Sequence, residues 1–431
     1  MISELAFPGL LVGGSLAFEQ FVSPARVLFG QISDAHPLGG RHRVPYIWLG
    51  TLLFCLLAVG SVPLIFQVGR LLQAGVSTVL ALSIAALCGL FALYGLAVSL
   101  ATTPYLALVI DRTSEAERPR AVGLIWCMLT VGIVIGAITI AISLKSLDGV
   151  SDPAALEPAL IAFMARIAIA VMLLTLLATW GMEPRRETGS IEGQAAPRDD
   201  AITLSQAWAL ITSSRQVLVF FAFLICFTLG LFLQDPILES YGAQVFGMPI
   251  AATASLNAFW GIGTLGGLLL AGLWLVPRLG KLAAARLGCQ LILATLALLL
   301  LCGFTAKVPL LNAVLLLFGV AAGIGTNSAL VLMLDLTLPQ AAGTFVGVWG
   351  LAQALSRALG KVMGGGLFDL GRLLQIRLGL GSGPMPAYGL VLLVEMAIAA
   401  LALLLLARVN LRQFREDTGR SLSNVLALEL G

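Results

Sequence analysis

Long apolar stretches alternate with short polar loops along almost the whole chain. A transmembrane α-helix needs about 20 consecutive apolar residues, and most of these stretches are that long. We therefore predict eleven membrane-spanning helices joined by polar loops. The predicted spans are 5–29, 44–66, 79–110, 121–144, 160–182, 216–240, 250–274, 285–304, 309–334, 341–365 and 386–408.

The composition agrees with this pattern. Of 431 residues, 59% are hydrophobic and 11% are charged, whereas soluble proteins carry about 25% charged residues. So few charges cannot cover the surface of a soluble globule of this size. The composition excludes a soluble enzyme, a nucleic-acid-binding domain and a disordered scaffold, and it predicts an all-α polytopic membrane protein.

The positive charges predict the orientation of the spans. Loops after spans 1, 3, 5 and 7, together with the C-terminal tail, hold seventeen Lys and Arg residues, and the opposite loops hold five. Positive residues concentrate on the cytoplasmic side, so we place the linker and the C-terminus in the cytoplasm. The two histidines, His36 and His42, share one polar loop. We therefore expect no metal site built on histidine inside the membrane.

An internal repeat predicts two related halves. The segment Leu108-Val-Ile-Asp111-Arg-Thr113 resembles Leu332-Met-Leu-Asp335-Leu-Thr337, and Val-Gly follows each copy, ending at Gly123 and Gly347. Both copies lie at the cytoplasmic end of a span, as repeats in transporter-like folds do. We therefore predict an N-terminal half (1–182), a cytoplasmic linker with an interfacial helix (183–215), a C-terminal half (216–408) and a cytoplasmic tail (409–431).

The repeat leaves the two halves unequal. Spans 7–11 pair with spans 1–5, so the span at 216–240 has no counterpart. The simplest architecture is six plus six helices with the first helix absent from this sequence. A start codon assigned too late is the favoured explanation, and a protein that functions with eleven spans is the alternative.

The loop after the first span carries a charged motif. It runs Gly30-Gln-Ile-Ser-Asp34-Ala-His-Pro-Leu-Gly-Gly40-Arg41-His-Arg43 and resembles the loop signature of the major facilitator superfamily. Asp34 can accept hydrogen bonds from arginine or from a helix N-terminus, and the arginines can bind cytoplasmic carboxylates or anionic lipid headgroups. An ordinary cytoplasmic membrane anchor is the alternative interpretation.

Several segments give a more specific resemblance. Met1-Ile-Ser-Glu4-Leu, the run Arg41-His-Arg43-Val-Pro45-Tyr-Ile-Trp48-Leu-Gly50-Thr51, the segment from Asp111 through Arg120 to Gly123, and Phe414-Arg-Glu-Asp-Thr-Gly419-Arg-Ser-Leu are similar to the bacteriochlorophyll delivery (PucC/LhaA) family of the major facilitator superfamily. The resemblance is nearer to the members named as a bacteriochlorophyll synthase chain than to PucC itself. It covers essentially the whole chain.

This resemblance implies a photosynthetic assembly factor. Such a protein would bind bacteriochlorophyll transiently in a bacterial intracytoplasmic membrane and deliver it to light-harvesting or reaction-centre subunits, beside bacteriochlorophyll synthase and membrane lipids. Two alternatives stay open. One is an alternating-access transporter whose gate includes Asp34, Asp111 and Asp335, and the other is a structural partner that shapes antenna packing.

Polar residues inside the membrane are the candidate binding groups, because a charge there costs at least about 2.5–3.5 kcal/mol. We predict an ion pair between Arg357 and Glu395, and we expect Lys361 to reach the outer interface. A chlorophyll magnesium needs one axial ligand, although interhelical hydrogen bonds also explain the amides. The candidates are Glu19, Gln20, Asn257, Asn327, Gln353 and Glu395.

The sequence contains no catalytic constellation. It has no nucleophile–base pair, no Walker or Rossmann loop and no paired acidic motif for a magnesium diphosphate. We therefore expect no enzymatic activity from this chain alone, although an auxiliary role beside bacteriochlorophyll synthase is compatible with it.

Overall fold

The computed structural model describes residues 5, 7–75, 77–113, 118–145, 153–183, 215–335, 342–379 and 383–410. Apart from one isolated bridge between Leu38 and Arg41, these residues form helices and the turns between them. The predicted interfacial helix before residue 215 and the C-terminal tail beyond residue 410 lie outside the described residues. The all-helical fold class is confirmed.

The chain divides into two compact units. The first comprises Met1–Glu192, Asp235–Ser255 and Lys361–Ala387, and the second comprises Gly193–Gln234, Leu256–Gly360 and Tyr388–Gly431. Each unit is a set of segments that contact one another more than they contact the rest of the chain. The division into halves at 182 and 216 stays a prediction.

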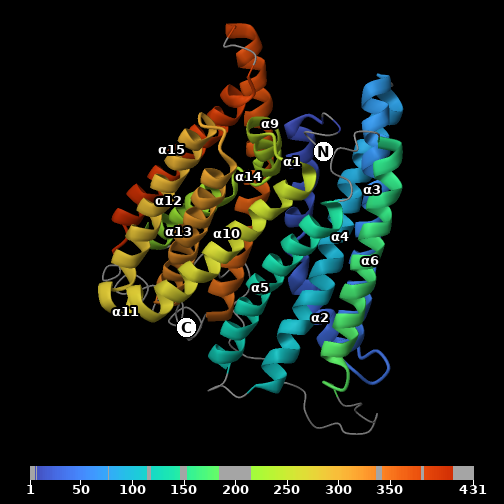
Figure 1. The fold of residues 1–431 in the computed structure, drawn as a ribbon. Coiled ribbons are helices and arrows are strands. Elements are labelled where there is room, and N and C mark those ends of the chain that lie inside the picture. Colours follow the sequence, from blue (N-terminus) through green and yellow to red (C-terminus); the bar gives the residue numbers. More distant parts are fainter. Residues whose placement is uncertain are drawn as a thin grey trace, which may run out of the picture. The chain divides into compact units, whose positions relative to one another are not determined.

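The first unit is built on one central pair of helices. In this unit α3 packs against α4 and α6, while α1 and α2 pack against α4 (Figure 1). The helices of this unit are α1 (Gly9–Phe21), α2 (Ala25–Ala35), α3 (Val44–Ala74), α4 (Ser77–Arg112), α5 (Arg118–Leu144), α6 (Pro153–Thr179) and α9 (Leu238–Phe246).

The second unit has α12 and α13 as its most closely packed pair, and α12 also contacts α8. Helix α10 begins in the first unit, and α14 ends in it. The remaining elements are α8 (Arg215–Phe232), α10 (Ile250–Leu270), the π-helix η2 (Ala271–Leu275), α11 (Val276–Leu279), α12 (Lys281–Gly303), α13 (Val308–Asp335), α14 (Ala342–Leu378) and α15 (Met385–Ala407).

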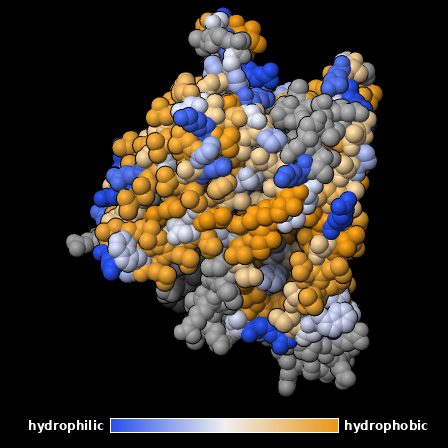
Figure 2. All heavy atoms as spheres, viewed as in Figure 1, coloured by the Kyte–Doolittle hydropathy of each residue, from blue (hydrophilic) through white to orange (hydrophobic). Residues whose placement is uncertain are grey.

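Every predicted span overlaps a helix, although α14 ends at Leu378 rather than at the predicted 365. Seven of the described helices are long and apolar enough to cross a membrane. Two shorter apolar helices, Met128–Leu144 and Leu218–Phe232, accompany them. Apolar side chains cover most of the face seen in Figure 2. Surfaces that face lipid are apolar, because the bilayer core offers polar side chains no hydrogen-bond partners.

Two predicted spans are broken rather than continuous. The span predicted at 5–29 is two helices, because α1 ends at Phe21 and α2 starts after Pro24. Proline has no N–H to continue the ladder, and Ser23 N–H donates to the Gln20 carbonyl at 3.1 Å to close α1. The span at 216–240 is interrupted in the same way, by a turn at 233–237 between α8 and α9 that contains a proline.

Paired glycines explain how α10 and α13 approach each other. A Cβ added at Gly263 or Gly267 would collide with carbonyl oxygens of α13, and one added at Gly319 or Gly323 would collide with carbonyl oxygens of α10. Two GxxxG motifs therefore face each other, which allows backbone-to-backbone packing.

Candidate functional site

Helices α1 and α14 touch along small residues within the first unit. A Cβ at Gly365 would meet the carbonyl of Gly9, and one at Gly13 would meet the carbonyl of Lys361. At the start of α1 the Asp369 carboxylate accepts hydrogen bonds from the N–H groups of Gly9 and Leu10, both at 2.7 Å. A carboxylate at a helix N-terminus satisfies donors that have no helical partner. This contact fixes α14 against α1.

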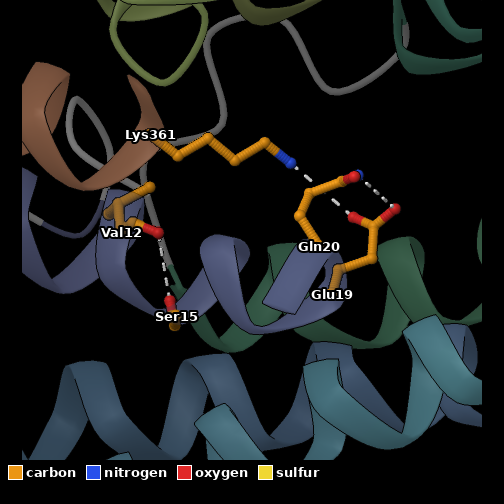
Figure 3. Close-up of polar contacts among 5 residues, drawn as sticks. All are labelled: Val12, Ser15, Glu19, Gln20 and Lys361. Carbon is orange, nitrogen blue, oxygen red and sulfur yellow. Dashed lines mark hydrogen bonds and ion pairs between the residues drawn. The ribbon is translucent and has the colours of Figure 1, made fainter. Parts of the chain in front are cut away.

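Near the other end of α1, the same pair of helices forms an ion pair. Lys361 Nζ lies 3.6 Å from Glu19 Oε2, with side-chain exposures of 14% and 27% respectively. Figure 3 shows Lys361 extending from α14 toward the last turns of α1. Two features stabilise the Lys361 ammonium there: the Glu19 carboxylate, and the negative end of the α1 helix dipole. Lys361 was expected at the outer interface, so the sequence alone missed this pair.

Further polar groups surround Glu19. Gln20 Nε2 donates a hydrogen bond to Glu19 Oε1 at 3.3 Å, and Tyr94 of α4 lies within electrostatic reach of the carboxylate. A Cβ at Gly95 would collide with the Glu19 carbonyl, so α4 passes directly against this turn of α1. We call Glu19, Gln20, Tyr94 and Lys361 the unit-1 polar cluster.

This cluster can do two kinds of chemistry. A carboxylate that is partly exposed and held by an ammonium can offer an oxygen to a hard metal centre such as magnesium. The same carboxylate can accept hydrogen bonds from a polar ligand. Both uses depend on Glu19 being accessible, and its 27% side-chain exposure meets that requirement.

The other predicted ligands lie in the second unit. Arg357 places its guanidinium 4.5 Å from the centroid of the Phe232 ring, and Glu395 on α15 is fully buried. The ion pair between Arg357 and Glu395 stays a prediction. Asn257 on α10 and Gln353 on α14 are partly buried, and Asn327 on α13 has a buried amide nitrogen.

The charged loop motif forms a compact structure between α2 and α3. Gly40, at φ 77°, adopts the left-handed conformation, and Leu38 and Arg41 exchange backbone hydrogen bonds across this turn. Arg43 Nη1 donates to Ser33 Oγ at 2.8 Å. Gly30 lies on α2, where a Cβ would stand 3.5 Å from Thr103 of α4.

A residue outside the motif organises this loop. The Glu183 carboxylate, just after α6, accepts hydrogen bonds from the N–H groups of His42 at 2.6 Å, Arg43 at 3.0 Å and Val44 at 2.8 Å. Glu183 therefore caps α3 through a distant carboxylate. Beside it, Trp48 Nε1 donates to Thr179 Oγ1 at 2.8 Å. Sequence reasoning missed Glu183, because it had assigned this residue to the linker.

The remaining predicted residues lie on helices, at positions whose side chains are outside the described part of the structure. These residues are Asp34, Asp111, Arg120, Gly123, Asp335 and Gly347. Their proposed roles in a repeat or gate stay predictions. Within the described part of the chain, no three His, Cys, Asp or Glu side chains are grouped so that they could hold a metal ion.

Comparison with known proteins identifies the family. The family model described as PUCC protein matches residues 1–414. The chain belongs to the PucC family. Among its relatives, Protein PucC of Rhodovulum sulfidophilum is 30% identical over 378 residues, covering 86% of this chain and 80% of that protein. The bacteriochlorophyll synthase 44.5 kDa chain of Rhodobacter capsulatus is 30% identical over 387 residues, covering 86% and 82%.

A third relative has no assigned role. It is a protein from the puhA-bchM intergenic region of Rhodobacter capsulatus, 30% identical over 382 residues, covering 86% of this chain and 75% of that protein. Its similarity extends over the same large share of the chain as that of the other two relatives.

Solved structures give the fold of this PucC-family chain. The nucleoside transporter NupG matches with a TM-score of 0.65 at 12% identity, covering 95% of this chain and 92% of that one. A bacterial homologue of the lysosomal transporter Spinster, inward-facing and occupied, matches with a TM-score of 0.63 at 16% identity, covering 96% and 92%. The chain is therefore a multi-pass membrane protein with a major-facilitator-like fold.

Proposed function

We propose that this protein is an assembly factor that binds bacteriochlorophyll and delivers it to light-harvesting or reaction-centre apoproteins. The observation that carries the proposal is the family match over residues 1–414. Relatives named for PucC and for a bacteriochlorophyll synthase chain, each 30% identical, support it. The family and the fold support a role in binding or transfer rather than catalysis.

The unit-1 polar cluster is the proposed binding site. A chlorin is a flat apolar ring whose magnesium needs one axial oxygen or nitrogen ligand, and magnesium prefers oxygen. Glu19 offers a partly exposed carboxylate in an apolar helix pair. Lys361 balances its charge, which lowers the cost of keeping this carboxylate in the membrane.

The test is pigment binding by the full chain. The protein is purified from pigmented membranes in mild detergent, and bound bacteriochlorophyll is quantified by absorbance. We expect near-stoichiometric pigment, reduced at least threefold by Glu19→Gln. The matched control is Glu157→Gln, which changes a carboxylate paired with Arg70 at 2.6 Å elsewhere in the same unit. Absence of both pigment and co-purifying photosynthetic subunits contradicts the proposal.

The proposal places the protein in the bacterial intracytoplasmic photosynthetic membrane, with the linker and the C-terminus in the cytoplasm. Its proposed partners are bacteriochlorophyll synthase, beside which it acts as an auxiliary protein, and the pigment-binding subunits. Crosslinking in pigmented membranes tests this. Recovery of neither the synthase nor an antenna or reaction-centre subunit contradicts the proposed partners.

A second candidate function is alternating-access transport of a small or amphiphilic molecule. The fold shared with solved transporters and the intramembrane pair of Glu19 and Lys361 favour it. Proton-coupled uptake into proteoliposomes that is lost in Glu19→Gln supports this function over pigment delivery. Pigment binding without any uptake supports delivery.

A further inference from the structure

The segment that follows α10 exposes apolar and positive side chains together. Leu273, Trp274 and Leu279 are 79%, 52% and 50% exposed, and Arg278 beside them is exposed as well. Apolar side chains that are grouped at a surface mark a contact with lipid or with a partner. We call these four residues, which lie between α10 and α12 in the second unit, the α10–α12 corner.

The guanidinium of Arg278 is held over the indole of Trp274. Its Cζ lies 4.4 Å from the centroid of the ring, which is a cation–π contact. Stacking uses the flat face of a guanidinium and leaves the N–H groups along its edge free to donate. Within the described part of the chain, Arg278 makes no hydrogen bond or ion pair. It therefore presents an oriented set of donors that an anion can accept.

This corner lies at one end of a membrane span. Residues 251–279 form that candidate span, and Trp274 is about 8 Å of helix from its last residue, at about 1.5 Å per residue. Tryptophan concentrates at the level of the lipid headgroups. The predicted orientation places this end of α10 at the cytoplasmic leaflet, where anionic lipids attract Lys and Arg. In Figure 2, hydrophilic and apolar residues meet at the end of the molecule where Figure 1 labels α11.

The sequence around the corner carries charges of one sign. Residues 240–334 include four Lys and Arg residues and no Asp or Glu. Three of the four, Arg278, Lys281 and Arg286, lie close together on α11 and the start of α12. Gly280, at φ 82°, forms the turn between these two helices. A ligand at the corner therefore meets positive charge without a competing carboxylate from this part of the sequence.

We propose that the α10–α12 corner binds an anionic phospholipid, an activity separate from pigment binding. The Arg278 guanidinium donates two hydrogen bonds to the lipid phosphate, the paired geometry that arginine offers to phosphate. Trp274 contacts the glycerol region and Leu273 contacts the acyl chains, while Lys281 and Arg286 add attraction at longer range. A free phosphate or an acidic protein segment would satisfy only the positive charge. A phospholipid also covers the apolar side chains beside it.

The test is the lipid preference of the full chain in phosphatidylcholine vesicles that contain some phosphatidylglycerol. Lipids with brominated acyl chains quench the fluorescence of the tryptophans that they touch, and subtracting the signal of Trp274→Phe isolates Trp274. We expect brominated phosphatidylglycerol to quench Trp274 at about fivefold lower mole fraction than brominated phosphatidylcholine, as one basic residue at an anionic surface predicts. Arg278→Gln should remove this preference. Arg278→Lys keeps the charge but loses the paired donors, so a preference of only about twofold should remain.

A matched charge removal separates a specific site from general attraction to anionic lipid. Arg408→Gln removes an exposed arginine just after α15, in the same unit and on the same predicted side of the membrane, and should leave the preference unchanged. Equal quenching by the two lipids in the unmodified protein overturns the lipid site. A preference that survives Arg278→Gln, or one that Arg408→Gln also removes, overturns it too. None of these outcomes affects the proposed function, because pigment binding is measured separately through Glu19→Gln.

Discussion

The Nζ of Lys361 lies 3.6 Å from Oε2 of Glu19, so residues near opposite ends of the sequence neutralise each other. The contact depends on glycines, because α14 reaches α1 only where Gly13 and Gly365 have no side chains. Close helix packing therefore sets the position of the ion pair. The pair in turn makes a carboxylate tolerable in an apolar part of the first unit.

The two side chains of this ion pair should contribute to stability as a coupled pair. We expect Lys361→Met or Glu19→Gln alone to cost about 1–3 kcal/mol, because each leaves a poorly solvated partner. The double variant should cost less than the sum of the single variants. Thermal unfolding in detergent measures this in a double-mutant cycle. Strictly additive costs would show that the two side chains are not coupled.

Removing the carboxylate that caps α1 should loosen the start of that helix. Asp369 accepts two N–H groups at 2.7 Å, so Asp369→Ala should cost about 1–2 kcal/mol of stability. Asp369→Asn keeps one acceptor and should cost less. Hydrogen exchange at Gly9 and Leu10 measures the effect locally. Unchanged protection of these amides in Asp369→Ala would contradict the capping role.

The glycines between α10 and α13 allow a test with a close internal control. Gly267→Ala places a Cβ against the Val320 backbone and should cost about 1–3 kcal/mol through overpacking. Its neighbour Gly266 has nothing within 4 Å of an added Cβ. Gly266→Ala should therefore be neutral, or stabilising by about 0.5–1 kcal/mol. Thermal unfolding of the two variants measures the difference, and equal effects would rule out the close approach.

The cap on α3 predicts that two glutamates of the first unit contribute differently to stability. Glu183 accepts several backbone N–H groups at the helix start, so Glu183→Ala should cost about 1–2 kcal/mol. Glu157 instead pairs with Arg70, whose side chain is 59% exposed. Glu157→Ala should cost no more than about 1 kcal/mol, as exposed ion pairs do. Denaturation of both variants tests this, and a larger loss in Glu157→Ala would contradict it.

The positions of the helices could be read from the sequence, because hydropathy over about 20 residues reports directly on burial in lipid. The facing motifs around Gly263 and Gly319 could also be identified, since small residues four apart indicate close packing. The break at Pro24 was not predicted. A single proline within an apolar run leaves the hydropathy unchanged, although it removes a helical hydrogen bond.

The candidate site could be predicted only in part. Glu19 and Gln20 stood out as polar residues within an apolar span, and the structure places them together with Lys361. Lys361 itself was assigned to the outer membrane interface. The position of a residue along a helix gives its depth in the membrane, but not the direction in which its long side chain extends. Glu183 was missed because its partners are backbone N–H groups, which leave no trace in the sequence.

By itself, the sequence determined that this chain is an all-helical membrane protein with polar residues inside its spans. These properties follow from local composition, which sets the free energy of each segment in lipid. Only the tertiary structure decided which polar groups meet, because pairing depends on helix rotation and on glycine contacts such as that between Gly9 and Gly365.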